Sequence, residues 1–362
     1  MAAEKYLMGR KGRLVKKPLV SIVIPSYNAE RTLAACIESA LAQDYPEKEV
    51  IVSDNASKDG SFGIAKSYEK LGVKVLRNDR NWGLAVNLNR AIKRARGGFI
   101  LALQDDCVLI GKDWVSRAMR RFRSKKVAGV SGKIVEDLGG FGFWDRIFRV
   151  LDRIAAASDA VEEVPFIENR CSVYAGDALM AAGGFSESYS ENAGEDQDLC
   201  YHLREKGFRF VLDRSLKAIH DYTVHQGSFL GDLRHEALYG RAAAQLALRH
   251  PLSLAGNVSY GADLGGRSRY RASIIAFVLL FLAFAALLPF QFQIGAALLA
   301  MLAAARILYF AWTCAPHIGI IGWNGALVFP FVGLLVDFIY FYGGLLGALE
   351  SVATRGSRGR RR

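Results

Sequence analysis

The chain has 362 residues, of which 51% are hydrophobic, and its formal net charge is +12. This length allows one domain of ordinary size with a further part beside it. The positive charge gathers at the two ends, because residues 1–17 hold six basic side chains against one acid and residues 355–362 hold five arginines. No nucleic-acid motif lies between these ends, so we expect contacts with anionic lipid and no nucleic-acid partner.

The cysteines are scattered and show neither a CxxC pair nor metal-ligand spacing: Cys36, Cys107, Cys171, Cys200 and Cys314. An odd number of scattered thiols is typical of a reducing compartment. The basic residues near the start precede no apolar stretch of the secretory kind, so we expect no signal peptide.

Strand-like runs alternate with helical patterns in the first part of the chain. The runs of strand length are Leu19–Ile24, Val50–Val52, Val73–Leu76 and Phe99–Leu103. Apolar spacing predicts a helix that begins near Ala29 or Glu30 and another over Leu84–Arg94. This alternation is typical of an α/β domain with a mostly parallel sheet, and such sheets bind ligands at the carboxyl ends of their strands.

Polar side chains follow directly after these strands. Gln104, Asp105 and Asp106 end the run that begins at Phe99. Carboxylates in this place suit a divalent cation such as Mg²⁺ or Mn²⁺, which prefers oxygen ligands and offsets the charge of a leaving diphosphate. The simpler alternative is an acidic turn after a strand. Asp54 follows the second strand, where an acid can accept hydrogen bonds from a base or a ribose.

The stretch RNDRNWG after the third strand places Asn81 and Gly83 at the start of a helix. Backbone N–H groups in this position can hold an anion. The two residues can equally form only the turn, so the sequence leaves both alternatives open.

A second acidic cluster lies at Glu195–Asp198 and is followed by apolar residues at helical spacing. The pattern predicts a helix with acids in its first turn, where they complement the helix dipole. Farther on, Phe208–Leu212 is predicted as a strand, and His220 and His225 follow it. A neutral imidazole can bind a metal, although a single histidine is more often structural.

Five stretches in this order resemble family 2 of the glycosyltransferases, the inverting enzymes of the GT-A class: SIVIPSYNAE, IVSDNASKDG, NWGLAVNLNRAI, QDD, and GEDQDLCYHLREKGFRF. The resemblance covers about Pro18–His225. It implies an α/β, GT-A nucleotide-sugar-binding domain. It also implies a nucleotide-diphosphate sugar as donor and a divalent metal, Mn²⁺ or Mg²⁺, as cofactor.

The resemblance implies roles for residues near the donor. The turn after the first strand matches the segment that holds the nucleotide, Asp54 matches the acid at the base, and Asp105 falls near the ribose and diphosphate. Together with the helix start considered above, the residues expected to bind nucleotide sugar are Pro25, Tyr27, Glu30, Asp54, Asn81, Gly83 and Asp105.

The resemblance also implies a metal site and a general base. Asp106 matches the direct metal ligand, and His220 fits an additional ligand slightly better than His225 does. Gln104 stands where the family has an acid, which puts strict metal dependence in doubt. Asp196 matches the general base that deprotonates an acceptor hydroxyl, and it would mainly position charge if the acceptor is a phosphate.

The end of the chain is very apolar. Its three apolar segments are Ala272–Leu288, Ile294–Trp312 and Ile318–Leu349. A bilayer is spanned by about 20 apolar residues, so two, three or four crossings are consistent with these lengths. Basic residues on both sides favour an even number with the catalytic domain cytoplasmic. Asp337 lies within the third segment and is expected to face a partner. Gly343, Gly344 and Gly347 could mediate helix association there.

Two amphipathic segments, Gly139–Ala157 and Leu233–His250, precede the apolar part. Each fits core packing or a helix lying in the bilayer interface, where it could guide a lipid acceptor. Trp144 on the first segment, together with Glu195 and His225, forms the expected acceptor side. The expected domains are a basic tail 1–17, a catalytic domain 18–230, an interfacial linker 231–271, transmembrane helices 272–350 and a basic tail 351–362.

These observations predict a membrane-anchored inverting glycosyltransferase that moves a sugar to a lipid-linked, polyprenyl acceptor at the cytoplasmic face. A polysaccharide-extending enzyme is the alternative, although no QxxRW motif is present. A non-catalytic scaffold that binds nucleotide sugar is the alternative from another class. Gln104 favours the scaffold, and the joint presence of Asp54, Asp106 and Asp196 argues against it.

Overall fold

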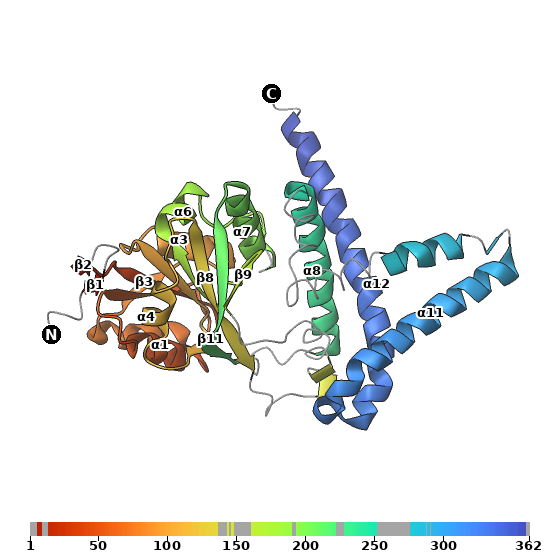
Figure 1. The fold of residues 1–362 in the computed structure, drawn as a ribbon, viewed down its shortest axis with the longest axis horizontal. Coiled ribbons are helices and arrows are strands. Elements are labelled where there is room, and N and C mark those ends of the chain that lie inside the picture. Colours follow the sequence, from red (N-terminus) through yellow and green to blue (C-terminus); the bar gives the residue numbers. More distant parts are fainter. Residues whose placement is uncertain are drawn as a thin grey trace. The chain divides into compact units, whose positions relative to one another are not determined.

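The computed structural model describes residues 6–8, 14–136, 143–144, 146–147, 161–189, 193–221, 228–251, 276–286, 288–289 and 291–359. The chain forms two compact units. The first comprises Met1–Asp137 with Ser158–Val224 and is an α/β domain, and the second comprises Leu138–Ala157 with His225–Arg362 and is helical where it is described (Figure 1).

The first unit contains one large mixed sheet and a small hairpin of β1 and β2. Its strands are β1 (Tyr6–Met8), β2 (Leu14–Lys16), β3 (Val20–Ser26), β4 (Lys48–Asp54), β5 (Lys74–Arg77), β6 (Phe99–Leu103), β7 (Cys107–Leu109), β8 (Val127–Glu136), β9 (Val161–Val164), β10 (Cys171–Ala175) and β11 (Arg209–His220). The order in the large sheet is β5-β4-β3-β6-β10-β8-β11-β7, with β9 paired to β11.

The sheet changes direction at β6. Strands β5, β4, β3 and β6 are parallel, as the alternation of strand and helix predicted. Strand β10 then runs antiparallel to both β6 and β8, and β7 and β9 run antiparallel to β11. The sheet as a whole is therefore mixed rather than mostly parallel, because the later strands return without a crossover helix at each step.

Helices cover both faces of this sheet (Figure 1). They are α1 (Leu33–Leu41), α2 (Ser61–Ser67), α3 (Leu84–Ile92), α4 (Trp114–Met119), α6 (Gly176–Ala181) and α7 (Glu195–Glu205). One core joins α1 and α4 to alternate residues of β3, β6 and β10, such as Ile22, Leu101 and Val173. Since side chains alternate along a strand, the intervening residues face the layer of α3, α6 and α7.

Helix α1 begins later than the sequence predicted. The expected start was Ala29 or Glu30, and the observed start is Leu33. Asn28 has a left-handed φ of 53°, and the N–H groups of Thr32 and Leu33 both donate to the carbonyl of Ala29. A tight turn therefore occupies the residues between β3 and the helix.

Strand β11 is longer than predicted. The sequence indicated Phe208–Leu212, and the strand continues to His220 across an irregularity between Asp213 and Lys217. The Asp213 carboxylate holds this irregularity, because it accepts hydrogen bonds from Arg121 Nε at 2.7 Å and from the backbone of Ser215 at 3.0 Å. His220 is consequently the last residue of a strand and not part of a loop.

The described part of the second unit contains three long helices. Its described helices are α8 (Phe229–Arg249), the short apolar segment Ala276–Ala285, α11 (Phe292–Cys314) and α12 (Ile318–Gly359), with a 3-10 turn at Ala315–His317. Helix α12 is interrupted at Gly322, where φ is 69°. The predicted amphipathic segment Leu233–His250 is the body of α8, and most of Gly139–Ala157 lies outside the described residues.

Asp337 is buried and paired, as its place in an apolar segment required. Arg306 of α11 donates to Asp337 of α12 from Nε at 2.7 Å and from Nη2 at 3.2 Å. Two parallel hydrogen bonds offset the cost of burying both charges. Removing either partner would leave the other charge buried alone, so this pair ties α11 to α12.

The glycines of α12 face α8 within the same chain. A Cβ at Gly343 would lie 1.9 Å from the carbonyl oxygen of Ala237, and one at Gly347 would lie 2.3 Å from that of Arg241. The two helix backbones can approach this closely only because these side chains are absent. Gly343 and Gly347 are therefore used for packing inside the unit.

One stretch of the described chain, Phe292–Ser351, is apolar and long enough to cross a membrane by length and composition. Only 17% of its most apolar 18-residue segment is buried, so much of that segment is accessible at the surface of the unit. Large exposed side chains on it include Trp312 and Trp323. Association with a membrane is the natural way to cover such a surface.

The glycine packing gives a prediction with a neighbouring control. Gly343→Ala should destabilise the helical unit by about 1–3 kcal/mol, because the added methyl group meets the α8 backbone. Gly344→Ala should be tolerated, since its nearest atom would lie at 3.6 Å. Thermal unfolding in detergent measures both. Equal melting temperatures for the two variants would show that the helices do not pack through Gly343.

Candidate active site

The carboxyl ends of β3, β4 and β6 meet at one edge of the sheet. Ser26 pairs with Asp54 in the parallel register of β3 and β4, and the N–H of Asn55 donates to the carbonyl of Ser26 at 2.8 Å. The loop after β6 is attached to the same edge, because Asp105 Oδ2 accepts a hydrogen bond from the N–H of Tyr27 at 3.0 Å. Residues from three separate sequence stretches are thus brought together here.

The turn after β3 is held by side chains on both of its sides. Pro25 is buried at the end of the strand, and the Tyr27 side chain is 40% exposed beside it. Glu30 accepts a hydrogen bond from the N–H of Gly60 at 2.9 Å, and its own N–H donates to Asp59 at 3.1 Å. Glu30 therefore joins the turn after β3 to the turn after β4.

Asp54 is only 1% exposed at the end of β4. The N–H of Ser57 lies 3.3 Å from its Oδ2, and Arg77 Nε at the end of β5 lies 3.5 Å from the same oxygen. The neighbouring Ala56 has a left-handed φ of 61°, so the chain turns sharply around this carboxylate. These contacts fix the Asp54 carboxylate at the sheet edge, where it is a hydrogen-bond acceptor.

Asn81 and Gly83 take part in a closed hydrogen-bond network. Asn81 Oδ1 accepts from Asn55 Nδ2 at 2.7 Å and from the N–H of Gly83 at 2.9 Å. Asn55 Oδ1 accepts from Asn78 Nδ2 and from the N–H of Trp82. Because the N–H of Gly83 is already used inside the loop, these contacts correspond to the turn-forming alternative.

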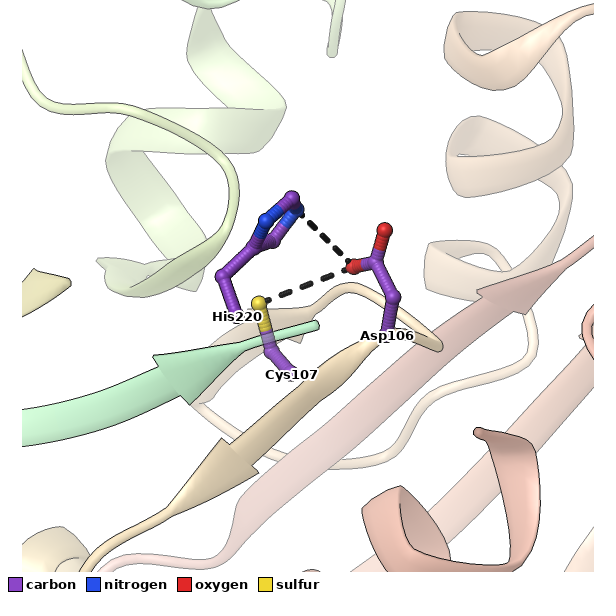
Figure 2. A group of neighbouring side chains, drawn as sticks. All are labelled: Asp106, Cys107 and His220. Carbon is purple, nitrogen blue, oxygen red and sulfur yellow. Dashed lines mark hydrogen bonds and ion pairs between the residues drawn. The ribbon is translucent and has the colours of Figure 1, made fainter. Parts of the chain in front are cut away.

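Asp106 lies next to His220 (Figure 2). Asp106 Oδ1 is 3.2 Å from His220 Nε2, and both side chains are 6% exposed. The two residues meet because β7 pairs with β11 in a register that sets Cys107 opposite His220. The N–H of Asp221 also donates to the carbonyl of Asp106 at 2.8 Å. A sheet contact therefore fixes the distance between the two side chains.

Cys107 completes a group of three ligand atoms that lie within 4.8 Å of one another. Its thiol donates to Asp106 Oδ1 at 3.7 Å. Burial raises the pKa of this thiol well above its ordinary value, and the charge of Asp106 raises it further. A hard divalent cation prefers oxygen and imidazole nitrogen, so Asp106 and His220 fit such an ion and the thiol is the poorer donor.

Gln104 is held through its backbone. Its N–H donates to the carbonyl of Arg170 at 3.0 Å, and its carbonyl accepts from the thiol of Cys36 at 3.2 Å. These contacts bind the end of β6 to the loop before β10 and to α1. The residue that departs from the family pattern therefore stands at a well-anchored point of the chain.

The acidic cluster forms the first turn of α7, as predicted. Gly194 precedes it with φ of 97°, and Glu195, Asp196 and Asp198 follow. Burial raises the pKa of Glu195. Burial, followed by the charges of Glu195 and Glu168, raises the pKa of Asp196 well above its ordinary value. The carboxyl of Asp196 therefore has a strong tendency to hold a proton.

Asp198, in the same turn as Asp196, has a different partner. It accepts a hydrogen bond from the hydroxyl of Tyr189 at 3.0 Å. It also lines an open pocket of about 510 Å³ with His202 of α7, Asn89 of α3 and the loop 182–187. The lining of this pocket includes none of the residues that the sequence predicted for the site.

Two of the predicted residues, Trp144 and His225, belong to the second unit. The ring of Trp144 packs there against Phe229 with 4.6 Å between ring centroids. His225 lies outside the described residues.

Sequence reasoning missed several residues of the site. Cys107 could have been noticed, since it follows Asp106 directly. Arg77 and Asn55 stand at strand ends, which is the signal that revealed Asp54. Asn169 and Tyr174, which lie beside α7, carried no signal, because only the antiparallel insertion of β10 places them there.

The fold and the strand-end acids define a nucleotide-sugar enzyme of the GT-A class. The structure is similar to that of mannosyltransferase PcManGT from Pyrobaculum calidifontis, solved in complex with GDP-Man and Mn²⁺. The TM-score is 0.57 at 19% identity, over 90% of this chain and 88% of that chain. This likeness establishes the fold.

Residues 21–179 match the family described as Glycosyl transferase family 2. EpsE from Bacillus subtilis (strain 168) is 29% identical over 244 residues, which are 65% of this chain and 85% of EpsE. The Escherichia coli protein WfgD, a UDP-Glc:alpha-D-GlcNAc-diphosphoundecaprenol beta-1,3-glucosyltransferase, is 40% identical over 92 residues, or 25% of this chain and 36% of WfgD. The chain is a glycosyltransferase that carries a family 2 domain.

The ligand cluster predicts how the protein binds Mn²⁺. Asp106→Asn and His220→Ala should each weaken binding about tenfold or more, because each removes a ligand atom. Cys107→Ala should bind nearly as tightly as the parent, since a buried thiol is not the preferred donor for a hard cation. Electron paramagnetic resonance of free Mn²⁺ measures the three affinities. A loss in Cys107→Ala as large as that in Asp106→Asn would make the sulfur a ligand.

Proposed function

We propose that this protein is an inverting glycosyltransferase that transfers a sugar from a nucleotide-diphosphate donor to a lipid-linked, polyprenyl acceptor at the cytoplasmic face of a membrane. One observation carries the proposal. Asp105 and Asp106 follow the central strand β6, Asp54 ends β4 on the other side of β3, and His220 Nε2 lies 3.2 Å from Asp106 Oδ1. This arrangement provides acceptors for a nucleoside and ligands for a cation at one sheet edge.

The donor is bound by the ends of the parallel strands. The fixed carboxylate of Asp54 accepts a hydrogen bond from the base, and the exposed ring of Tyr27 lies at the same edge with Pro25 behind it. Asp105 lies near the ribose and diphosphate, since its contact with Tyr27 fixes it between β3 and β6. Glu30 contributes to donor binding indirectly, because it holds the turn after β3 against the turn after β4.

Asp106 and His220 would hold the divalent cation, Mn²⁺ or Mg²⁺. When bound, such an ion offsets the negative charge that develops on the departing nucleoside diphosphate. The side chain at position 104 is an amide and adds no charge, so the site has fewer carboxylates than the family pattern. Its affinity for the ion depends correspondingly more on Asp106 and His220.

Asp196 is the proposed general base. Burial and the charges of Glu195 and Glu168 raise the pKa of this carboxyl, so its carboxylate form accepts a proton more readily than an ordinary aspartate does. It then takes the proton of the acceptor hydroxyl as that oxygen attacks the anomeric carbon. If the acceptor is a phosphate, which needs no strong base, Asp196 positions it.

The acceptor class is inferred from the apolar helical unit. The stretch Phe292–Ser351 provides an exposed apolar surface suited to a bilayer. A relative that matches part of the chain, WfgD, acts on a diphosphoundecaprenol-linked sugar according to its name. An enzyme held at the membrane meets such an acceptor at high local concentration. Trp144, Glu195 and His225 remain the proposed acceptor side.

The function is tested by release of nucleoside diphosphate from purified protein. UDP-, GDP- and dTDP-sugars are supplied with Mn²⁺ or Mg²⁺, with and without a polyprenyl phosphate or a polyprenyl diphosphate sugar. We expect release that requires the lipid. Asp196→Asn should bind the donor within about threefold of the parent and lose about 100-fold or more of its turnover, because a general base contributes that much.

The controls separate the alternatives. Asp198→Asn, which alters the next acid of α7, should retain most of its turnover, since its partner is Tyr189. Release that requires a soluble saccharide would indicate polysaccharide extension instead. Donor binding without release under every combination would identify a scaffold, and unchanged turnover of Asp196→Asn would remove it as the base.

The membrane arrangement is tested separately. We propose several crossings, with the catalytic domain and the arginine-rich C-terminal tail both cytoplasmic. Tags at the two termini should be digested by protease in inside-out vesicles and protected in right-side-out vesicles. Protection of only one tag in a given orientation would mean an odd number of crossings.

A further inference from the structure

Two buried polar groups at the acidic turn of α7 lack hydrogen-bond partners among the described residues. Glu195 is 4% exposed, and its Oε2 is buried without a hydrogen-bond partner among the described residues. Asn169 is 3% exposed, and its Nδ2 is likewise buried and makes no hydrogen bond to a described residue. Buried polar groups are almost always paired, so two unpaired groups in one cluster call for an explanation.

The orientation of Asn169 is fixed by Tyr174. The hydroxyl of Tyr174 lies 2.7 Å from Asn169 Oδ1. Burial raises the pKa of Tyr174 well above its ordinary value, so the phenol keeps its proton and can only donate here to the amide oxygen. The ring of Tyr174 is itself held edge-on against Phe185 with 5.6 Å between centroids. The remaining group of the amide, its NH₂, is thereby free to act as a donor.

Asn169 lies close enough to both acids of the pair to act on their charge. Its side chain favours the charged form of Glu195 and its backbone favours that of Asp196, so each lowers the pKa of its carboxyl against the effect of burial. Asn169 lies in the loop before β10, and Glu195 is the first residue of α7. One residue of a loop thus connects the central sheet to the catalytic turn.

We infer that Asn169 is a positioning residue for the Glu195–Asp196 pair. Because Tyr174 occupies the amide oxygen of Asn169, the unpaired NH₂ group is left as the donor for the unpaired carboxylate oxygen of Glu195, and pairing of the two holds the acidic turn in the orientation in which Asp196 accepts a proton. The inference rests on the proposed function, because it assigns Asn169 a role only if Asp196 is the base. Asn169 does not itself touch the substrate in this scheme.

The charges around the pair set the direction of the expected pH effect. Glu168 is the other acid that acts on Asp196, and Arg170 lies 3.6 Å from Glu168. The thiol of Cys200, one turn along α7, and the phenol of Tyr174 both have a raised pKa and are neutral. Asn169 is therefore a neutral donor among acids, and removing its amide should make both carboxyls harder to ionise.

The test compares Asn169→Ala, Asn169→Asp and Tyr174→Phe with Asp196→Asn in full-length protein. A base must be deprotonated to act, so the acid limb of the kcat profile should move to higher pH in Asn169→Asp and Asn169→Ala. We expect kcat to fall tenfold or more at the acid end of the profile and to recover in part at its alkaline end, with KM for the donor within twofold. Tyr174→Phe should show the same pattern more weakly.

Tyr45→Phe is the matched control. It also removes a buried phenol hydrogen bond, from Tyr45 to the carbonyl of Pro18, but away from α7. It should leave the pH profile unchanged at a comparable loss of melting temperature. If Asp196→Asn abolishes turnover while the Asn169 variants keep the parent pH profile, the positioning role is overturned and the proposed base stands. If Asp196→Asn keeps its turnover, both fail.

Discussion

The position of β6 in the sheet is the constraint on which the active site depends. This strand pairs in parallel with β3 and antiparallel with β10, so it stands where the two halves of the sheet join. Its entry is fixed by close approach: a Cβ at Gly97 would lie 2.6 Å from the backbone of Ser21, and the N–H of Gly176 donates to the carbonyl of Gly98 at 2.9 Å. Because the start is fixed, the register carries the acids after Leu103 to the sheet edge.

The two halves of the sheet contribute different chemistry to this edge. The parallel half supplies Asp54 and the turn that contains Tyr27, which are suited to hydrogen bonding with a nucleoside. The antiparallel half supplies His220, which reaches Asp106 only through the pairing of β11 with β7. The residues proposed to bind the nucleoside and the cation thus come from segments that are far apart in sequence and meet beside β6.

Local patterns predicted the parallel half and its acids, because a strand followed by a polar turn can be recognised from neighbouring residues. The pairing of distant strands cannot be recognised in this way. The mixed direction of the sheet and the extension of β11 to His220 depend on strand pairing and on contacts such as Asp213 with Arg121, which join elements far apart in the chain. The helix that begins at Glu195 was predicted, but its neighbour Asn169 was not, for the same reason.

The three acids with proposed roles in the reaction lie in three different environments. Asp54 is buried beside Arg77 and the backbone N–H of Ser57, which hold its carboxylate in one place. Asp106 faces His220, a neutral or cationic partner that can share a bound ion with it. Asp196 is buried among acids, and burial, followed by the charges of Glu195 and Glu168, raises its pKa. A fixed acceptor, a ligand and a base need these three environments, so the surroundings of each carboxylate match the step assigned to it.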